Sequence, residues 1–281
     1  MSINKPIIYA TNKDLLAEIH KSKISYSSFL TTDDQDFDII IEPSNPEETL
    51  SDTLLKCNIQ ENIESAIQAK KTRTGNPLIT IDDIVFRVMT WDHIPILPKV
   101  PKKVDKKKAK DLFDFDESAD PLDDLILIPD DLNDMVHSKV NFPPFQHYRF
   151  IDGTLTLVGK SHWMGDLIDG EFSKDHGEVT KYLAKMYIMM TERYAMKYQF
   201  RGYTYVDELK GCAILQLTYV GLRFNEARSN NPFSFLTQTI HNSFLRILKS
   251  EKKNQNIRDD LWEMAGVNPS FSRQNSGAFD E

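Results

Sequence analysis

Residues 205–253 read YVDELKGCAILQLTYVGLRFNEARSNNPFSFLTQTIHNSFLRILKSEKK, and this stretch decides the fold that the sequence predicts. Apolar residues at intervals of three and four predict a first helix over about 206–224. Asn231 is a favourable N-cap and Pro232 suits the first helical position, so a second helix is predicted to begin there. The stretch therefore predicts two consecutive helices joined by a short loop.

The first predicted helix is apolar on two sides. One stripe can pack against a neighbouring helix and consists of Val206, Leu209, Ala213, Leu217, Val220 and Phe224. The opposite side carries Gly211, Ile214, Leu215, Tyr219 and Leu222, with Glu208 and Thr218 among them. A helix that is apolar all round is typically buried on both sides. It is therefore either a central core helix or a helix whose second side is covered only when a partner binds.

The second predicted helix has aromatic residues first and basic residues last. Its core stripe consists of Leu236, Ile240, Phe244, Ile247 and Leu248. Its outer face consists of Phe235, Gln238, Thr239, Asn242, Arg246, Lys249 and Lys253. Five basic residues and one acidic residue give residues 237–258 a net charge of +4. Such a face suits unpaired bases and phosphates, although basic residues also favour a solvated helix end through the helix dipole.

The run FRGYTYVDELKGCAILQLTYVGLRFNEARSNNPFSFLTQTIHNSFLRILKSEKK, residues 200–253, resembles region two of sigma factors. It is most similar to the late-transcription sigma factor of T-even-type phages, in the long form of marine cyanophages. The shared pattern is a helix ending in Phe-Asn-Glu, a short loop, Asn-Pro-aromatic, and a helix ending in Phe-x-Arg-x-Leu and a basic run. The runs NKDLL (12–16) and RDDLWEMAGVNPSFSRQ (258–274) fit the same type, and the specific part covers about 110 residues, 161–274.

The resemblance implies that the first helix docks on the clamp helices of the largest subunit of the host RNA polymerase. The residues expected in this contact are Glu208, Gly211, Leu215, Thr218, Tyr219 and Leu222. The second helix is expected to meet an AT-rich promoter element near the start site. Phe233 and Phe235 are expected to support strand opening by stacking or wedging.

The same resemblance assigns base and phosphate contacts along the second helix. The residues expected to read bases or the upstream duplex edge are Gln238, Thr239, Asn242 and Arg246. The residues expected to hold phosphates are Lys249, Lys252 and Lys253. Ordinary sigma factors carry tyrosines and tryptophans in this helix, where Leu236 and Ile240 stand here. Base capture is therefore expected to be weaker, and a co-activator more necessary.

A charged stretch, residues 98–122, has the composition of a disordered linker. Late sigma factors of the family bind the replication sliding clamp through a short hydrophobic-acidic motif at the C-terminus. This chain ends in Ser-Gly-Ala-Phe-Asp-Glu, with one aromatic residue, which departs from that pattern. The clamp contact is either Phe279, or the segment with Leu112, Phe113 and Phe115, or absent.

Composition narrows the class of protein. The 281 residues carry a formal net charge of −8, whereas a free DNA-binding protein is usually basic. DNA binding is therefore expected only when a partner provides most of the contacts to the phosphates. Two cysteines without a CxxC motif favour a reducing cytosol and argue against a zinc site. No signal peptide and no apolar run of membrane-spanning length are found. The resemblance implies the cytoplasm of the infected bacterial host as the location.

The rest of the chain predicts shorter elements. Helices are predicted after the Thr11 cap and over about 46–70, 178–198 and 258–265, and strands over 36–41, 84–89 and 125–128. Alternating residues on both sides of Asp152-Gly153 predict a β-hairpin. The predicted fold class is mainly α: a C-terminal sigma-region-two-like helical bundle with an N-terminal mixed α/β insert that contains the hairpin and the linker. The predicted divisions are 1–97, 98–122, 123–160, 161–265 and 266–281.

Enzymatic chemistry is not expected. No phosphate-binding loop, metal-ligand set, dinucleotide fingerprint or catalytic triad occurs, and no cofactor is expected. A hydrolase using Ser161, His162 and Asp166 is disfavoured because adjacent residues do not form a triad and no nucleophile elbow is present. The alternative to the sigma-like function is a non-enzymatic helical scaffold or interaction protein that does not recognise promoters.

Overall fold

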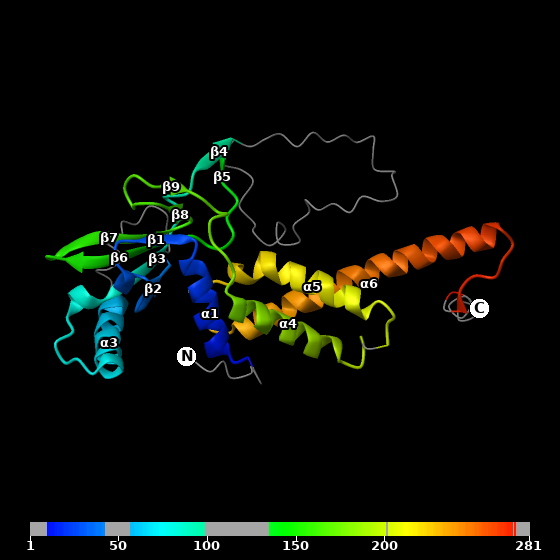
Figure 1. Ribbon diagram of the computed structural model, residues 1–281, viewed down its shortest axis with the longest axis horizontal. Coiled ribbons are helices and arrows are strands. Elements are labelled where there is room, and N and C mark those ends of the chain that lie inside the picture. The colour runs from blue at the N-terminus through cyan, green and yellow to red at the C-terminus, as the bar shows by residue number, and fades with distance from the viewer. Residues whose placement is uncertain (1–9, 43–56, 99–134, 201, 272, 274–281) are drawn as a thin grey trace. The chain divides into compact units, whose positions relative to one another are not determined.

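A computed structural model describes residues 10–42, 57–98, 135–200, 202–271 and 273 of the chain (Figure 1). The chain divides into two compact units, one of residues 1–90 with 140–281 and one of residues 91–139. The second unit contains an antiparallel strand pair, β4 (Ile96–Pro98) with β5 (Met135–His137). The predicted strand 125–128 and the linker 98–122, apart from Pro98, lie outside the described residues, as do Leu112, Phe113, Phe115 and Phe279.

The first unit contains a five-stranded sheet with the strand order β1-β7-β6-β3-β2. Its strands are β1 (Ser27–Phe29), β2 (Ile39–Ile41), β3 (Val85–Met89), β6 (Phe145–Ile151) and β7 (Thr154–Ser161). All neighbours pair antiparallel except β2 and β3, which pair parallel. The predicted hairpin is confirmed as β6 and β7. Its turn residues, Asp152 and Gly153, have φ angles of 52° and 75°, the left-handed values that a two-residue type I′ turn requires.

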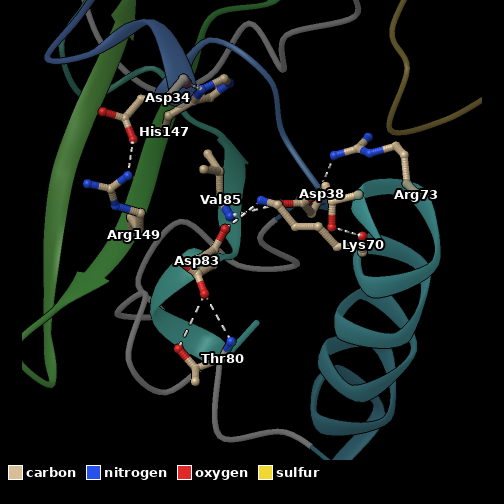
Figure 2. Close-up of polar contacts among 10 residues, drawn as sticks. Asp34, Asp38, Lys70, Arg73, Thr80, Asp83, Val85, His147 and Arg149 are labelled. Atoms are coloured by element: carbon tan, nitrogen blue, oxygen red, sulfur yellow. Dashed lines mark hydrogen bonds and ion pairs between the residues drawn. The ribbon is translucent and has the colours of Figure 1, made fainter. Parts of the chain in front are cut away.

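Helix α3 (Cys57–Thr74) packs its Ile63 against Ile39, Ile41, Phe86 and Val88 on one face of the sheet. Successive strand residues face opposite sides, so Arg87 of β3 projects from the other face. Figure 2 shows the polar contacts at the edge of the α3 layer, where Asp38 accepts from Lys70 and Val85 and pairs with Arg73. The helix was predicted over 46–70, and residues 43–56 lie outside the described part of the chain.

The helices of the first unit share one apolar core. They are α1 (Asn12–Ile24), α4 (Lys181–Ala195), α5 (Val206–Val220), the 3₁₀ turn η3 (Gly221–Arg223) and α6 (Pro232–Met264). The predicted stripes supply that core, with Leu183 and Met186 from α4, Leu217 from α5 and Phe244 from α6. Figure 1 shows α4, α5 and α6 side by side. A side chain at Gly221 would come within 2.0 Å of the Tyr187 hydroxyl, so the residue that follows α5 is a glycine where the chain packs against α4.

The predicted helix starts are confirmed at two positions. Thr11 and Asp14 form the capping box of α1, in which each backbone N–H donates to the side chain of the other residue. Asn231 caps α6 by accepting from the Ser234 N–H. The predicted break between a helix ending near Lys253 and one over 258–265 is wrong. No Gly or Pro lies between Phe233 and Ala265, so α6 continues for 33 residues.

Gly266 ends α6 in a Schellman motif. Its φ angle is 73°, its N–H donates to the Glu263 carbonyl, and the Val267 N–H donates to the Trp262 carbonyl. Ser270 then donates from its N–H and its hydroxyl to the carboxylate of Asp259. The chain therefore turns back along the end of α6 after Gly266.

The predicted fold class, mainly α, is wrong. Among the described residues, five α-helices stand beside a five-stranded sheet and two small two-stranded sheets, so the chain is mixed α/β. The sheet is not a separate insert, because it lies in the same compact unit as the helical bundle. The second small sheet pairs β8 (Trp163–Met164) with β9 (Glu171–Phe172).

Candidate functional site

Helix α5 presents an exposed face that contains five of the six residues predicted to bind polymerase. Leu215 and Tyr219 are large apolar side chains with exposed fractions of 56% and 65%. Glu208, Gly211 and Thr218 are exposed beside them. Leu222 differs, because the helix ends at Val220 and the 3₁₀ turn places Leu222 in the core with 3% exposure. The face of α5 is therefore defined here as Glu208, Gly211, Leu215, Thr218 and Tyr219.

Helix α6 presents a second exposed face, which is polar and basic. Phe233, at its first turn, has an exposed fraction of 38%. The exposed predicted residues that follow are Gln238, Asn242, Arg246, Lys249, Lys252 and Lys253. The Gln238 amide donates to Asn242 Oδ1 at 2.8 Å, so these two amides already form one hydrogen-bonding surface. The remaining donors and acceptors of both amides are open to solvent.

Two predicted DNA-contacting residues of α6 lie elsewhere. The Thr239 side chain is buried and its hydroxyl donates to the Phe235 carbonyl at 3.0 Å. Phe235 is half-buried, with its ring centroid 5.7 Å from that of Phe224. Both residues lie beside the core stripe of Leu236 and Ile240, which turns them towards the bundle. Thr239 is therefore not placed to read bases, and Phe235 is available only at its edge.

A cleft of about 450 Å³ lies where the loop after α5 meets the start of α6. Its lining residues are Arg223, Phe224, Asn225, Arg228, Ser229, Asn231, Ser234 and Phe235. Sequence reasoning missed this cleft apart from Phe235. The signal was present in the loop, where NEARSNN (225–231) places arginine among short polar residues. Such a lining can hold a planar, anionic ligand through arginine, amide and aromatic contacts.

Arg228 is the exposed cation of this cleft. Its guanidinium donates from Nε and Nη2 to Glu42 Oε1 at 3.0 and 2.9 Å. Both side chains are exposed, and exposed ion pairs contribute at most about 1 kcal/mol. Arg228 can therefore exchange its carboxylate partner for a phosphate at small cost in free energy.

Behind the cleft lies a buried ion pair between α1 and the loop. Lys23 Nζ donates to Glu226 Oε2 at 2.7 Å and to the Phe224 carbonyl at 2.8 Å. Burial lowers the pKa of Lys23, and Glu226 offsets only part of that effect. Burial alone would raise the pKa of Glu226, but the charges of Lys23 and Arg87 outweigh it and hold that pKa below its ordinary value.

Arg87 occupies the interior between the sheet and α1. Its guanidinium carbon lies 3.9 Å from the ring centroids of both Phe37 and Phe145. Its Nε–H donates to His147 Nε2 at 2.9 Å, and its Nη2 lies 3.2 Å from His20 Nδ1. Arginine has only donors, so both imidazoles must offer an unprotonated nitrogen. Burial lowers the pKa of Arg87 to about 10.

The two histidines are kept neutral by the same surroundings. Burial and then the Arg87 charge lower the pKa of His20 from 6.5 to about 4. The same two causes hold the pKa of His147 well below 6.5. His147 Nδ1 donates to the Asp34 carbonyl at 2.7 Å, and the Asp34 carboxylate pairs with Arg149 at 2.8 Å (Figure 2). This network joins α1 to the sheet.

Ser161 and His162 contact each other, with Ser161 Oγ 3.3 Å from His162 Nδ1, and Asp166 contacts Trp163 instead. Ser161 and His162 are fully buried, and the Ser161 hydroxyl accepts from the Phe145 N–H at 2.8 Å. The His162 ring lies 4.1 Å from that of Phe142. Asp166 is exposed, and its carbonyl accepts from the Trp163 indole. The described residues contain no group of three His, Cys, Asp or Glu side chains arranged to hold a metal ion.

Comparisons of the chain with models of protein families, with curated proteins and with solved structures found no match. No helix built from described residues combines the length and the apolar character needed to cross a membrane.

Proposed function

We propose that the protein is a sigma-like initiation factor, encoded by a phage, that binds the host core RNA polymerase and opens an AT-rich late promoter element. The observation that carries the proposal is the pairing of two exposed faces on consecutive helices. The face of α5 offers apolar side chains to another protein, and the exposed face of α6 offers aromatic, amide and basic side chains to nucleic acid. In this proposal the protein acts in the cytoplasm of the infected bacterium.

The polymerase contact is assigned to the face of α5. Leu215 and Tyr219 lie one helical turn apart on it, and Gly211 lies one turn before Leu215. Exposed large apolar residues grouped in this way are typical of protein interfaces. An α-helix with a glycine on its exposed face also allows the backbone of a partner helix to approach closely. The clamp helices of the largest polymerase subunit are the proposed partner.

The DNA contact is assigned to the cleft and to the exposed face of α6. An unpaired base can stack on Phe233, a contact worth about 1–3 kcal/mol. Arg228, Asn225 and Asn231 line the cleft. Lys249, Lys252 and Lys253 follow on α6 as exposed cations for the phosphates. One or two stacked bases cannot melt a promoter alone, so the polymerase and a co-activator, for which the sliding clamp is a candidate, supply the rest.

The test is reconstitution of the full chain with host core polymerase on an AT-rich promoter, with and without the sliding clamp. The expected result is co-purification with the polymerase and permanganate reactivity of unpaired thymines. Leu215→Asp/Tyr219→Asp should weaken polymerase binding at least about tenfold, because each change buries a carboxylate in an apolar contact. Met196→Asp/Tyr198→Asp alters two exposed apolar residues after α4 and is the matched control.

A second double substitution distinguishes the role of the cleft and α6 from that of the face of α5. Arg228→Ala/Phe233→Ala should reduce promoter opening while the affinity for polymerase stays unchanged. If the wild-type chain does not bind the polymerase at all, the proposal fails, and the non-enzymatic scaffold becomes the better interpretation. Equal polymerase binding by the α5 variant and its control would remove the assigned interface.

A further inference from the structure

The wall of the cleft is held from the interior by one buried ammonium group. Lys23, in the last turn of α1, donates to the Phe224 carbonyl and to the Glu226 carboxylate. These acceptors stand on either side of Asn225, which lines the cleft together with Phe224. A single side chain therefore fixes the backbone before Asn225 and the side chain after it.

The constraint continues along the loop through Asn225. The Asn225 side-chain oxygen accepts from the Ala227 N–H at 2.9 Å. The backbone carbonyl of Asn225 accepts from the N–H groups of Arg228 and Ser229, both at 3.3 Å. Residues 225–229 thus form a turn built on Asn225. Arg228 and Ser229, which also line the cleft, are connected to Lys23 through this turn.

Stability alone is a weak reason for a buried ion pair at this point. Transfer of two charges from water costs free energy that their attraction only partly returns, and a pair of apolar residues is often as stable. The pair does offer directed hydrogen bonds, which apolar residues cannot. A charged side chain with two short donor contacts fixes a loop in one geometry.

We propose that Lys23 and Glu226 are positioning residues that hold loop 223–229 in the shape that receives an unpaired nucleotide of the opened strand. Neither residue lines the cleft, and both act through Phe224 and Asn225. The nucleotide as ligand rests on the proposed function, whereas the ordering of the loop does not. Arg223, Asn225 and Arg228 supply the groups that meet the nucleotide.

The informative variant removes both charges together. Lys23→Met/Glu226→Gln removes the cation and the anion of the pair together, and it deprives the Phe224 carbonyl of its donor. Arg87, which Glu226 and Asp36 compensate from further away, keeps Asp36. Lys21→Met is the matched control, because Lys21 lies on the same helix in an ion pair with Glu18 at 2.7 Å but is exposed. Lys23→Arg keeps the positive charge but places its donors on a larger planar group. If the double variant does not fold, the measurements below are made on Lys23→Arg instead.

The first measurement is amide hydrogen exchange in the full-length chain without DNA. The backbone of 224–231 should exchange at least about tenfold faster in Lys23→Met/Glu226→Gln, while core amides of α5 and α6 stay protected. Lys23→Arg should lie between this variant and wild type, and Lys21→Met should equal wild type. Unchanged exchange of 224–231 in the double variant and in Lys23→Arg overturns the proposal, whatever the protein's function.

The second measurement compares polymerase binding with promoter opening. Promoter opening by the double variant should fall about tenfold, the value of a lost base stack, while the affinity for polymerase changes less than twofold. A merely structural role would lower both together, and that result also overturns the proposal. If wild type shows no opening, the proposed function fails, and the exchange experiment still decides the ordering of the loop.

Discussion

At the scale of single residues, Arg87 is a buried cation whose hydrogen-bonding partners among the described residues are imidazoles and not carboxylates. Two phenylalanine faces and two neutral imidazoles surround it, and a cation over aromatic faces is stabilised most where water is excluded. Glu226 and Asp36 compensate its charge from further away. The arrangement holds only while His20 and His147 remain unprotonated, because a protonated imidazole has no acceptor to offer.

This requirement predicts an acid-sensitive fold. Between about pH 4 and 6.5, the unfolded chain binds a proton at His20 that the folded chain excludes. The free energy of unfolding should therefore fall as the pH drops from 6.5 towards 4, by up to about 3 kcal/mol for His20 alone. His147, whose pKa is lowered in the same direction, adds to the loss. Urea unfolding at a series of pH values measures it.

His20→Gln tests the assignment, because glutamine can still accept from Arg87 and donate to Asp36 without titrating. The slope of unfolding free energy against pH should become shallower between pH 6.5 and 4. His137→Gln replaces an exposed histidine and should leave the slope unchanged. The same slope in all three proteins would show that His20 is not the group responsible.

The roles of single residues could be predicted where the interacting partner lies close in the sequence. Thr11 with Asp14 and Asn231 with Pro232 are caps that act within four positions, and the structure confirms both. The buried network could not be predicted, since its partners lie 60 to 203 positions apart. Leu222 continued the apolar pattern of its helix, and only the early 3₁₀ turn directs it to the core.

At the scale of elements, α5 combines a buried stripe with an exposed apolar face. Leu209, Ala213 and Leu217 are fully buried against the neighbouring helices, while Leu215 and Tyr219 are not. One side is core and the other is open in the isolated chain, so a central core helix buried on both sides is wrong. The covering of the open side by a partner stays a prediction. Periodicity identifies two apolar sides, but only packing shows which of them the chain itself covers.

Gly211 gives α5 a specific prediction. It lies inside the helix, and an added side chain would meet nothing within 4 Å. Gly211→Ala should therefore stabilise the isolated chain by about 0.5–1 kcal/mol, through the lower entropy cost of alanine in a helix. The added methyl group should nevertheless weaken polymerase binding, because a partner backbone packed against the glycine would have to move. Thermal unfolding and polymerase titration measure the two effects.

Ser250→Ala is the control for Gly211→Ala. It also raises helix propensity at an exposed position, on α6 instead of α5. It should stabilise the chain slightly without any change in polymerase affinity. If Gly211→Ala binds polymerase as tightly as wild type, no close backbone contact forms at the face of α5.

The elements of the helical half were predicted better than those of the sheet. Helices α4, α5 and α6 carry apolar stripes over several turns, and the 152–153 turn marks its hairpin. The strands predicted over 36–41 and 84–89 correspond to β2 and β3, whereas β1 has three residues, too few for an alternating pattern to stand out. The long helical stripes therefore favour a mainly α class in the sequence, and the structure is mixed α/β. The cleft was missed because it forms only when the loop and α6 are folded together.

At the scale of the whole molecule, the charge is uneven. The chain has a formal net charge of −8, yet the exposed face of α6 carries Arg246, Lys249, Lys252 and Lys253. A protein of this charge should bind DNA weakly when free and use its basic face only within a larger complex. This weak binding stays a prediction from the charge of the sequence.

The basic face predicts a defined salt dependence. Lys249→Gln/Lys253→Gln should lower the slope of log binding constant against log salt by about 1 to 2 for the polymerase complex on promoter DNA, because about 0.9 counterions per phosphate contact are no longer released. Lys181→Gln/Lys185→Gln removes two exposed charges with the same spacing from α4. Equal effects of the two variants would mean that general charge, not phosphate contact on α6, sets the slope.

The hydrogen bond from Lys23 to Glu226 joins residues far apart in the sequence, and this has a consequence for synthesis of the chain. Its carboxylate partner lies 203 positions later, so the ammonium stays hydrated until Glu226 has left the ribosome. The α1 helix and the strand that carries Arg87 emerge long before the loop that completes their cluster. A nascent chain that ends before Glu226 therefore lacks the ion pair that holds loop 223–229.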